Sequence, residues 1–162
     1  MARLEPFFAA LAPPGGWAHV GPCEAGHYVK MVHNAVEYVL MQGYAEGMEL
    51  LRAAPWPLPV GAIAELWRHG SVVRSWLLDL LAAALAREGE DLPHLRGWVE
   101  DSGEGRWALE TAVAQAVPVP ALAAALFARF RSLQEDPYGA KILALLRHEF
   151  GGHALRPEAA PE

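Results

Sequence analysis

The sequence predicts an all-α fold, a multi-helix domain built around one long helix. Residues 26–51 contain no proline and keep apolar side chains at helical spacing over seven turns. No alternating run of β-branched residues persists for the length of a strand. The nearest approach to a Gly-rich dinucleotide loop is Gly103-Glu104-Gly105, with no strand pattern before it. We therefore expect no Rossmann domain among these residues.

The long helix carries its polar residues on one stripe. Lys30, His33, Asn34 and Glu37 follow one another at i, i+3, i+4 and i+7, so their side chains leave the helix on the same side. His27 and Tyr38 extend this stripe at its two ends, and the apolar residues occupy other azimuths. A polar stripe on an apolar helix is either a solvated face or the wall of a site.

Shorter helices precede and follow the long one. A turn or two of helix in residues 4–13 is stopped by Pro-Pro-Gly-Gly, and 17–22 is expected to be extended. After the long helix, a proline-rich connection at 54–61 leads into the next helical pattern. Periodicity predicts helices over residues 60–69, 71–88, 92–100, 107–115, 121–134 and 140–150. Ser71 is the expected N-cap of the second of these, while a Gly-rich turn at 101–106 and VPVP at 117–120 separate later ones.

Composition limits the function classes. The 162 residues are enough for one domain, with 53% hydrophobic and 20% charged residues, which fits a packed core. A net charge of −6 argues against nucleic acid or an anionic membrane as the main partner. Cys23 is the only cysteine, so we expect neither a disulfide framework nor a thiolate metal site. With no signal pattern and no apolar run of spanning length, the cytoplasm is the expected location.

The stripe can be interpreted either as an acid–base site or as a solvated row of charges. Lys30 and Glu37 lie two turns apart, roughly 10 Å along the axis at 1.5 Å per residue, which leaves room for a sugar-sized molecule between a base and an acid. A lysine acts as a base at neutral pH only if its pKa falls by about three units. Spacing alone favours the alternative, a solvated row of charges. His33 and Glu37 lack a third ligand for a metal, and we expect no metal site.

The stretch GHYVKMVHNAVEY resembles the active-site helix of the 6-phosphogluconate dehydrogenases, whose pattern is GH-aromatic-VKMVHN-x-x-EY. The resemblance extends in order from residue 17 to 153, through GP-x-x-AGH at 21–27, WRHGSVVRS at 67–75, EDSGEGRW at 100–107, VPVPAL with FARFRS at 127–132, and R-x-x-FGGH at 147–153. The short chain after the long helix is similar to the short branch of the family, which often prefers NAD.

The resemblance implies a role for each residue of the stripe. Lys30 matches the general base that takes the proton of the 3-hydroxyl, and Glu37 matches the acid that protonates the enediol carbon after carbon dioxide leaves. His33 and Asn34 match residues that hold the substrate's hydroxyls and carboxylate. No residue of this chain matches a cofactor contact beyond Asn34.

The resemblance also implies a phosphate site. Tyr38, Arg106 and Arg129 match contacts of the substrate phosphate. Arg147 and His153 match a C-terminal pair that closes on the substrate, in many relatives from the neighbouring subunit. The guanidinium of arginine can donate two parallel hydrogen bonds to a phosphate or carboxylate, which the lysine ammonium cannot. These positions therefore suit a sugar phosphate acid. On the residues alone, each arginine is equally well explained as a surface charge.

The family's cofactor domain is missing from this stretch, which divides the chain into three expected parts. Residues 1–25 are expected to be a linker or the remnant of the end of a cofactor domain, 26–153 the helical substrate-binding and dimerisation domain, and 154–162 a flexible tail. The implied reaction converts 6-phosphogluconate to ribulose 5-phosphate with NAD or NADP, in a homodimer that needs a Rossmann domain from elsewhere. The alternative is a non-catalytic dimerisation module or remnant of the family.

Overall fold

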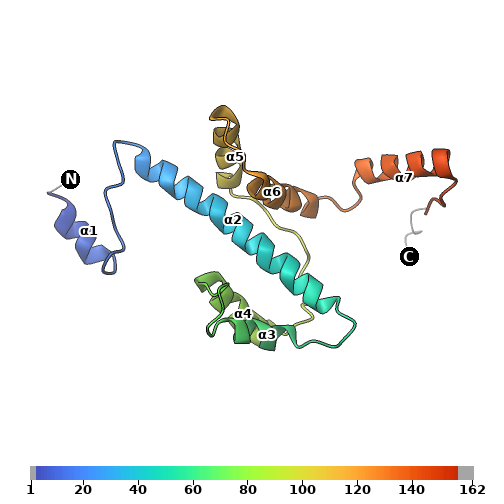
Figure 1. Cartoon of the computed structure of the whole chain (residues 1–162), viewed down its shortest axis with the longest axis horizontal. Coiled ribbons are helices and arrows are strands. Elements are labelled where there is room, and N and C mark those ends of the chain that lie inside the picture. Colours follow the sequence, from blue (N-terminus) through green and yellow to red (C-terminus); the bar gives the residue numbers. More distant parts are fainter. Residues whose placement is uncertain (1–2, 157–162) are drawn as a thin grey trace.

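The structure is a computed structural model that describes residues 3–156, and these residues form helices joined by loops, with no strand among them (Figure 1). The all-α prediction is therefore confirmed. The helices are α1 (Glu5–Leu11), α2 (Ala25–Arg52), α3 (Val60–Trp67), α4 (Trp76–Glu88), α5 (Glu104–Ala114), α6 (Pro120–Ser132) and α7 (Tyr138–Gly151).

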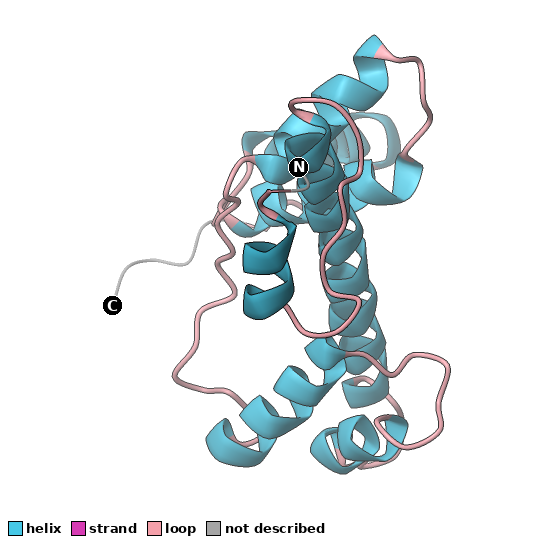
Figure 2. Cartoon of the chain, turned by 90° about the vertical axis from the view of Figure 1, so that its left-hand side faces the viewer, coloured by secondary structure: helices cyan, strands magenta, loops and turns pink. Residues whose placement is uncertain are grey.

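The long helix α2 is the axis of the molecule, and two small cores form along it (Figures 1 and 2). Beside its first half, α5 and α6 pack against it and against each other. Tyr38 of α2 and Leu126 of α6 are almost fully buried in this first core, together with alanines that let the helices approach closely. The polar stripe of α2 therefore begins at the edge of a packed three-helix unit.

The second core joins the later half of α2 to α3 and α4. Leu78 and Ala64 are fully buried there, with Met48 of α2 packed against them. The first turn of α3 has no cap from its own chain neighbours, because Pro59 precedes it. The Glu90 carboxylate accepts hydrogen bonds from the backbone N–H groups of Val60 and Gly61 instead, at 3.1 and 2.8 Å.

Two local predictions from the sequence are wrong. The helix expected from Ser71 begins only at Trp76, because residues 71–75 form a turn and Ser75 has the extended backbone of an N-cap. The Ser75 hydroxyl accepts a hydrogen bond from the Leu78 backbone N–H at 3.1 Å. The segment 92–100 forms no helix: Leu92 has a φ of 46°, and the Pro and Gly nearby supply further breaks in the pattern.

The two serines make a matched test of this cap. Ser75→Ala is expected to lower the free energy of unfolding by about 1 kcal/mol, because the first turn of α4 loses its acceptor. Ser71→Ala removes only an acceptor for the Val73 backbone N–H in a turn. Its loss in the free energy of unfolding is expected to be a small fraction of the loss in Ser75→Ala. Urea unfolding of the two variants measures both effects, and a larger loss in Ser71→Ala would contradict the assignment of the cap.

The first and last helices contribute little to either core. α1 has no buried residue, although the rings of Phe8 and Trp17 contact each other. α7 projects away from the central helices (Figure 1), and its described side chains from Tyr138 to Glu149 are all exposed. Residues 154–156 have no regular structure, and the rest of the expected tail lies outside the described residues. Within 3–156, no helix is long and apolar enough to span a bilayer.

Candidate functional site

The polar stripe lies on the side of α2 that borders the start of α5. Lys30 and His33 are exposed there, whereas Asn34 and Glu37 are half-buried. The His33 imidazole Nδ1 lies 3.4 Å from the Asn34 amide oxygen. No described side chain hydrogen-bonds to Glu37, so its carboxyl remains open to a ligand. The stripe is thus only partly solvated, and its acidic end is partly enclosed.

Lys30 forms an ion pair across 74 residues of sequence. Its Nζ donates to the Glu104 carboxylate Oε1 at 2.9 Å. The other oxygen of that carboxylate accepts a hydrogen bond from the Ser102 hydroxyl. The Ser102 hydrogen bond, and then the one from Lys30, lower the pKa of Glu104 to about 2. Glu104 is therefore an anion fixed next to the lysine that begins the stripe.

The turn that carries Glu104 is docked on α2 through Tyr38. The Ser102 backbone N–H donates to the Tyr38 hydroxyl at 3.3 Å. Gly105 packs directly on the Tyr38 ring, where an added Cβ would lie 2.6 Å from the nearest ring carbon. Gly103 has a φ of 96°, which allows the chain to turn into α5 at this point.

Tyr38 consequently departs from the stripe that the sequence predicted. It is 4% exposed, and its ring lies inside the first core because it follows Glu37 by one residue, which turns it by about 100° around the helix. Its hydroxyl still reaches the turn at the edge of that core. The guanidinium carbon of Arg129, from the end of α6, lies 3.4 Å from the centre of the same ring.

Arg106 lies close to this cluster but already has a partner. Its Nε and one terminal nitrogen donate to the two oxygens of Asp101, at 2.9 and 2.8 Å. This fork is the main reason why the pKa of Asp101 is lowered. The guanidinium carbon also lies 4.2 Å from the centre of the Phe130 ring. The structure thus gathers Arg106 and Arg129 around one buried end of the turn, each with one face occupied.

A cavity of about 580 Å³ opens between the beginning of α2 and α5. This volume is typical of small-molecule sites. Lys30 and two carboxylates, Glu24 and Glu104, are the charged residues that line it. The complete lining is Glu24, His27, Tyr28, Lys30, Met31, Glu104, Trp107 and Thr111.

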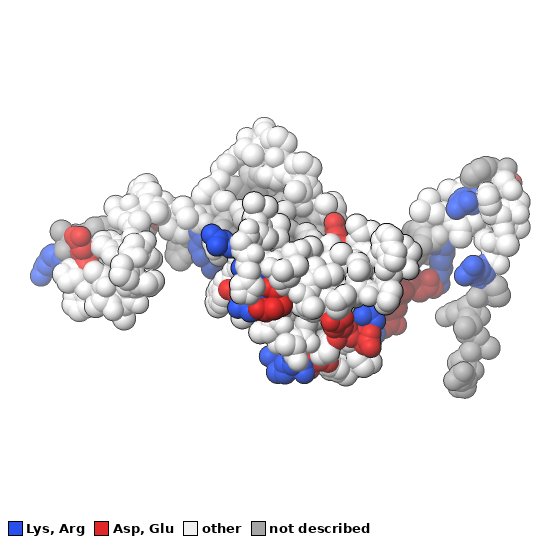
Figure 3. Space-filling model, turned by 60° about the horizontal axis from the view of Figure 1, so that its bottom comes forward, with Lys and Arg blue, Asp and Glu red and all other residues white. Residues whose placement is uncertain are grey.

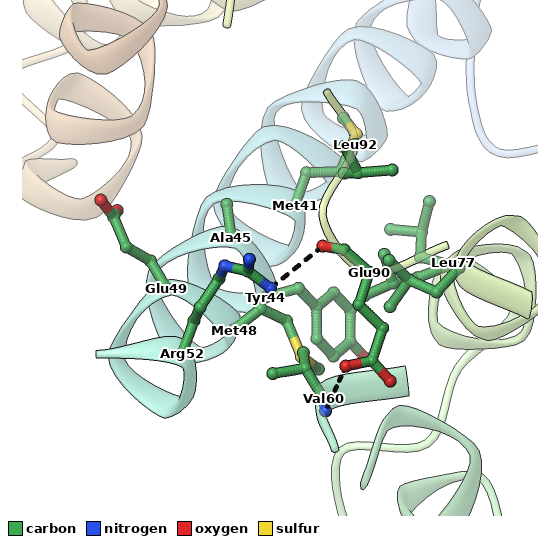
Figure 4. Close-up of a pocket in the computed structure, with 12 residues that line it drawn as sticks. Met41, Tyr44, Ala45, Met48, Glu49, Arg52, Val60, Leu77, Glu90 and Leu92 are labelled. Carbon is green, nitrogen blue, oxygen red and sulfur yellow. Dashed lines mark hydrogen bonds between the residues drawn. The ribbon is translucent and has the colours of Figure 1, made fainter. Parts of the chain in front are cut away.

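A second cavity of about 440 Å³, between α2, α3 and α4, is much more apolar (Figure 4). Its cation Arg52 already donates to the Glu90 carbonyl and pairs with Asp91. The Glu90 carboxylate points to the backbone of Val60, as Figure 4 shows. In both cavities the cation is already paired, Arg52 with Asp91 here and Lys30 with Glu104 in the first.

Arg147 and His153 are not brought to the stripe within one chain. Arg147 lies on α7, which projects away from α2, and His153 follows that helix after Gly152 (Figure 1). The His148 ring Nδ1 and the His153 carbonyl are 2.8 Å apart, so the chain folds back after the helix. The structure thus joins Lys30 to Glu104 and Arg129 to Tyr38, and it places Arg147 on a different helix, α7.

The charged surface shows no single-sign basic patch on the face in view. Figure 3 shows acidic and basic side chains side by side over the central helices, in line with the ion pairs between them. Within residues 3–156, no three of the His, Cys, Asp and Glu side chains come together in a way that could hold a metal ion.

Glu104, Ser102 and Asp101 escaped the sequence-based prediction. All three lie in the stretch EDSGEGRW, which the sequence singled out only for Arg106. The signal that could have found Glu104 is a carboxylate directly after a glycine in a tight turn, next to the predicted start of a helix. Nothing local, however, shows that this turn meets Lys30, because 74 residues separate the two.

The anchored carboxylate gives the domain a defined sensitivity to acid. Because the pKa of Glu104 is lowered from 4.5 to about 2 in the folded state, its contribution to stability is present above pH 4.5 and is lost as the pH falls toward 2. The Glu104→Gln variant is expected to lose less stability than the wild type over that window, although Asp101 contributes in both proteins. Thermal unfolding midpoints of both proteins, measured across this pH range, test the expectation. An identical dependence of the midpoint on pH in the two proteins would contradict it.

The fold and the site together define the class of the protein: an all-helical domain whose described residues contain a cation-bearing cavity and no nucleotide-binding sheet. The model of one protein family, described as the C-terminal domain of 6-phosphogluconate dehydrogenase, matches residues 26–149. The chain belongs to this family, which confirms the resemblance seen in the sequence.

Individual relatives agree with this assignment. The NAD(+)-dependent, decarboxylating 6-phosphogluconate dehydrogenase of Haloferax volcanii is 43% identical over 154 residues, covering 94% of this chain and 52% of the relative. YqeC of Bacillus subtilis, provisionally named a 6-phosphogluconate dehydrogenase, is 40% identical over 151 residues, covering 93% of this chain and 50% of the relative. The decarboxylating 6-phosphogluconate dehydrogenase of Lactococcus lactis subsp. lactis is 36% identical over 138 residues, covering 79% of this chain and 29% of the relative. The chain spans about half the length of the first two relatives.

Proposed function

We propose that this chain is the substrate-binding and dimerisation part of an enzyme that oxidatively decarboxylates 6-phosphogluconate to ribulose 5-phosphate and carbon dioxide. The observation that carries the proposal is the stripe of α2, where Lys30 borders a cavity of sugar size and Glu37 presents an open carboxyl seven residues further on. The family supports the same reaction, since the relative from Haloferax volcanii is named as a decarboxylating 6-phosphogluconate dehydrogenase.

The proposed chemistry divides two proton transfers between the two ends of the stripe. Lys30, as the neutral amine, takes the proton of the substrate's 3-hydroxyl during oxidation, and the resulting 3-keto acid loses its carboxylate as carbon dioxide. The enediol that remains is protonated at carbon by Glu37, and this gives the ketose. His33 and Asn34 lie between them, where they would hold hydroxyls and the carboxylate of the substrate.

The described residues do not by themselves fit a nicotinamide cofactor. They include no strand and no phosphate-binding loop between a strand and a helix. A domain outside this chain would hold NAD or NADP, which would supply the acceptor for the hydride of the substrate. Asn34 is the one residue here that we expect to touch it.

The phosphate of the substrate would bind at the end of the stripe that carries the arginines. The guanidinium of Arg129 lies over the Tyr38 ring, and its N–H donors would bind the phosphate. Arg106 is held by both oxygens of Asp101. It would therefore bind the phosphate with its remaining N–H donors, or by exchanging Asp101 for the phosphate. Arg106 comes from α5 and Arg129 from α6, the two helices that pack on the first half of α2.

A second copy of the chain would cover apolar surface that this monomer leaves exposed. On α2, Val29, Val32 and Val36 form an exposed apolar face beside the polar stripe. On α7, Leu143 and Leu146 are exposed as well. Contiguous apolar faces of this kind mark association surfaces. We therefore propose a homodimer in which Arg147 and His153 reach the partner's stripe.

A chimera tests the function directly. The part of YqeC that this chain does not match is joined to residues 1–162, and the release of carbon dioxide and the reduction of NAD or NADP are followed with 6-phosphogluconate. We expect turnover, and a loss on the order of 10²–10⁴-fold in the Lys30→Ala chimera because its base is removed. A folded chimera that is inactive while the intact relative turns over would contradict the proposal and favour a non-catalytic dimerisation module.

A further inference from the structure

Glu104 is the fixed member of its pair with Lys30. The Glu104 side chain is 18% exposed and is hydrogen-bonded to the Ser102 hydroxyl, whereas the Lys30 side chain is 61% exposed. The turn beneath it is docked on Tyr38 by the Ser102 backbone and by the close packing of Gly105. A long exposed lysine therefore meets a carboxylate whose position the fold determines.

The pair decides where the Lys30 amine lies in the absence of a substrate. An exposed lysine alone samples many rotamers, and holding it in one geometry costs side-chain entropy. The carboxylate at 2.9 Å offsets that cost and directs Nζ to the wall of the cavity that both residues line.

We propose that Glu104 is a positioning residue for Lys30: it holds the ammonium group at the wall of the cavity. The consequence for turnover rests on the proposed function of Lys30, whereas the pairing itself does not. The pairing and its consequence for turnover are therefore tested separately.

The pairing is tested on this chain alone with an amine-reactive reagent. Lys30 and Lys141 are its only lysines, so peptide mapping follows both rates in one sample. Glu104→Gln is expected to speed the labelling of Lys30 severalfold and to leave Lys141 unchanged, because the Lys30 nitrogen loses the carboxylate that holds it at 2.9 Å. The matched control is Asp136→Asn, which removes the carboxylate paired with Lys141 and should change only that lysine. Equal Lys30 rates in wild type and Glu104→Gln would overturn the proposal.

The catalytic consequence is tested on the chimera. Glu104→Gln is expected to lower the kcat of the chimera severalfold with little change in KM, because the amine is held less firmly while the substrate still binds, and Glu104→Asp should restore most of kcat. A loss in Glu104→Asp as large as that in Glu104→Gln would indicate a merely structural role and would overturn the proposal. A chimera with no turnover at any pH would count against the proposed function, and the labelling result would then decide on the pair alone.

Discussion

Gly105→Ala is expected to destabilise the domain by about 1–3 kcal/mol, although alanine is the better helix former. An added Cβ at this position would lie 2.6 Å from a Tyr38 ring carbon, well inside van der Waals contact. The ring has little freedom to move away, because it is 4% exposed and the guanidinium of Arg129 covers it. The clash therefore outweighs the gain of about 1 kcal/mol in helix propensity.

The matched control is a glycine in open space. Gly43 lies inside α2, is exposed, and would have no atom within 4 Å of an added Cβ. Gly43→Ala is thus expected to stabilise the chain by up to about 1 kcal/mol. Urea unfolding of both variants measures the opposite signs. A stable Gly105→Ala protein would show that the first turn of α5 is not packed on Tyr38 as described.

The loss in Gly105→Ala should extend to the site. If the turn moves, the Ser102 backbone loses the Tyr38 hydroxyl, and Glu104 moves away from Lys30. The labelling rate of Lys30 would then rise in this variant as it does in Glu104→Gln. One glycine would in this way connect the packing of the first core to the position of the proposed base.

The long helix was predictable because its signal is local. The apolar rhythm of residues 26–51 reproduces α2 to within one residue at each end, and the i, i+3, i+4, i+7 spacing places Lys30 and Glu37 on one side by geometry alone. The segment 92–100 misled the prediction because its apolar residues have a helical spacing that a positive φ at Leu92 interrupts. Ser71 and Ser75 are both capable caps, and the turn between them selects the later one.

The contacts that shape the site were not predictable in the same way. Glu104 meets Lys30, and Ser102 meets Tyr38, only because α5 packs across α2, and no periodic pattern reports that crossing. The burial of Tyr38 follows from the same packing. Chemical types on one helix can thus be identified from sequence, whereas their partners depend on long-range contacts. The roles of the individual residues remain predictions that the proposed experiments test.

Mixing two inactive variants of the chimera is expected to restore activity. In the proposed dimer, Lys30 belongs to one subunit of each site and His153 to the other, since α7 carries its C-terminal residues away from α2 in its own chain. Lys30→Ala and His153→Ala each damage both sites of their own homodimer. After subunit exchange, half of the dimers are mixed, and each holds one site with neither substitution. About a quarter of the wild-type turnover should therefore return.

The control for this experiment uses two substitutions on the same helix. Lys30→Ala mixed with Glu37→Gln should restore nothing, because both residues lie on α2 and every site of a mixed dimer keeps one of the two defects. Recovery in the first mixture but not in the second identifies a site shared between subunits. No recovery in the first, with subunit exchange demonstrated by differently tagged chains, would contradict the shared site. It would mean that α7 returns to the stripe of its own chain, against the separation of the two in this fold.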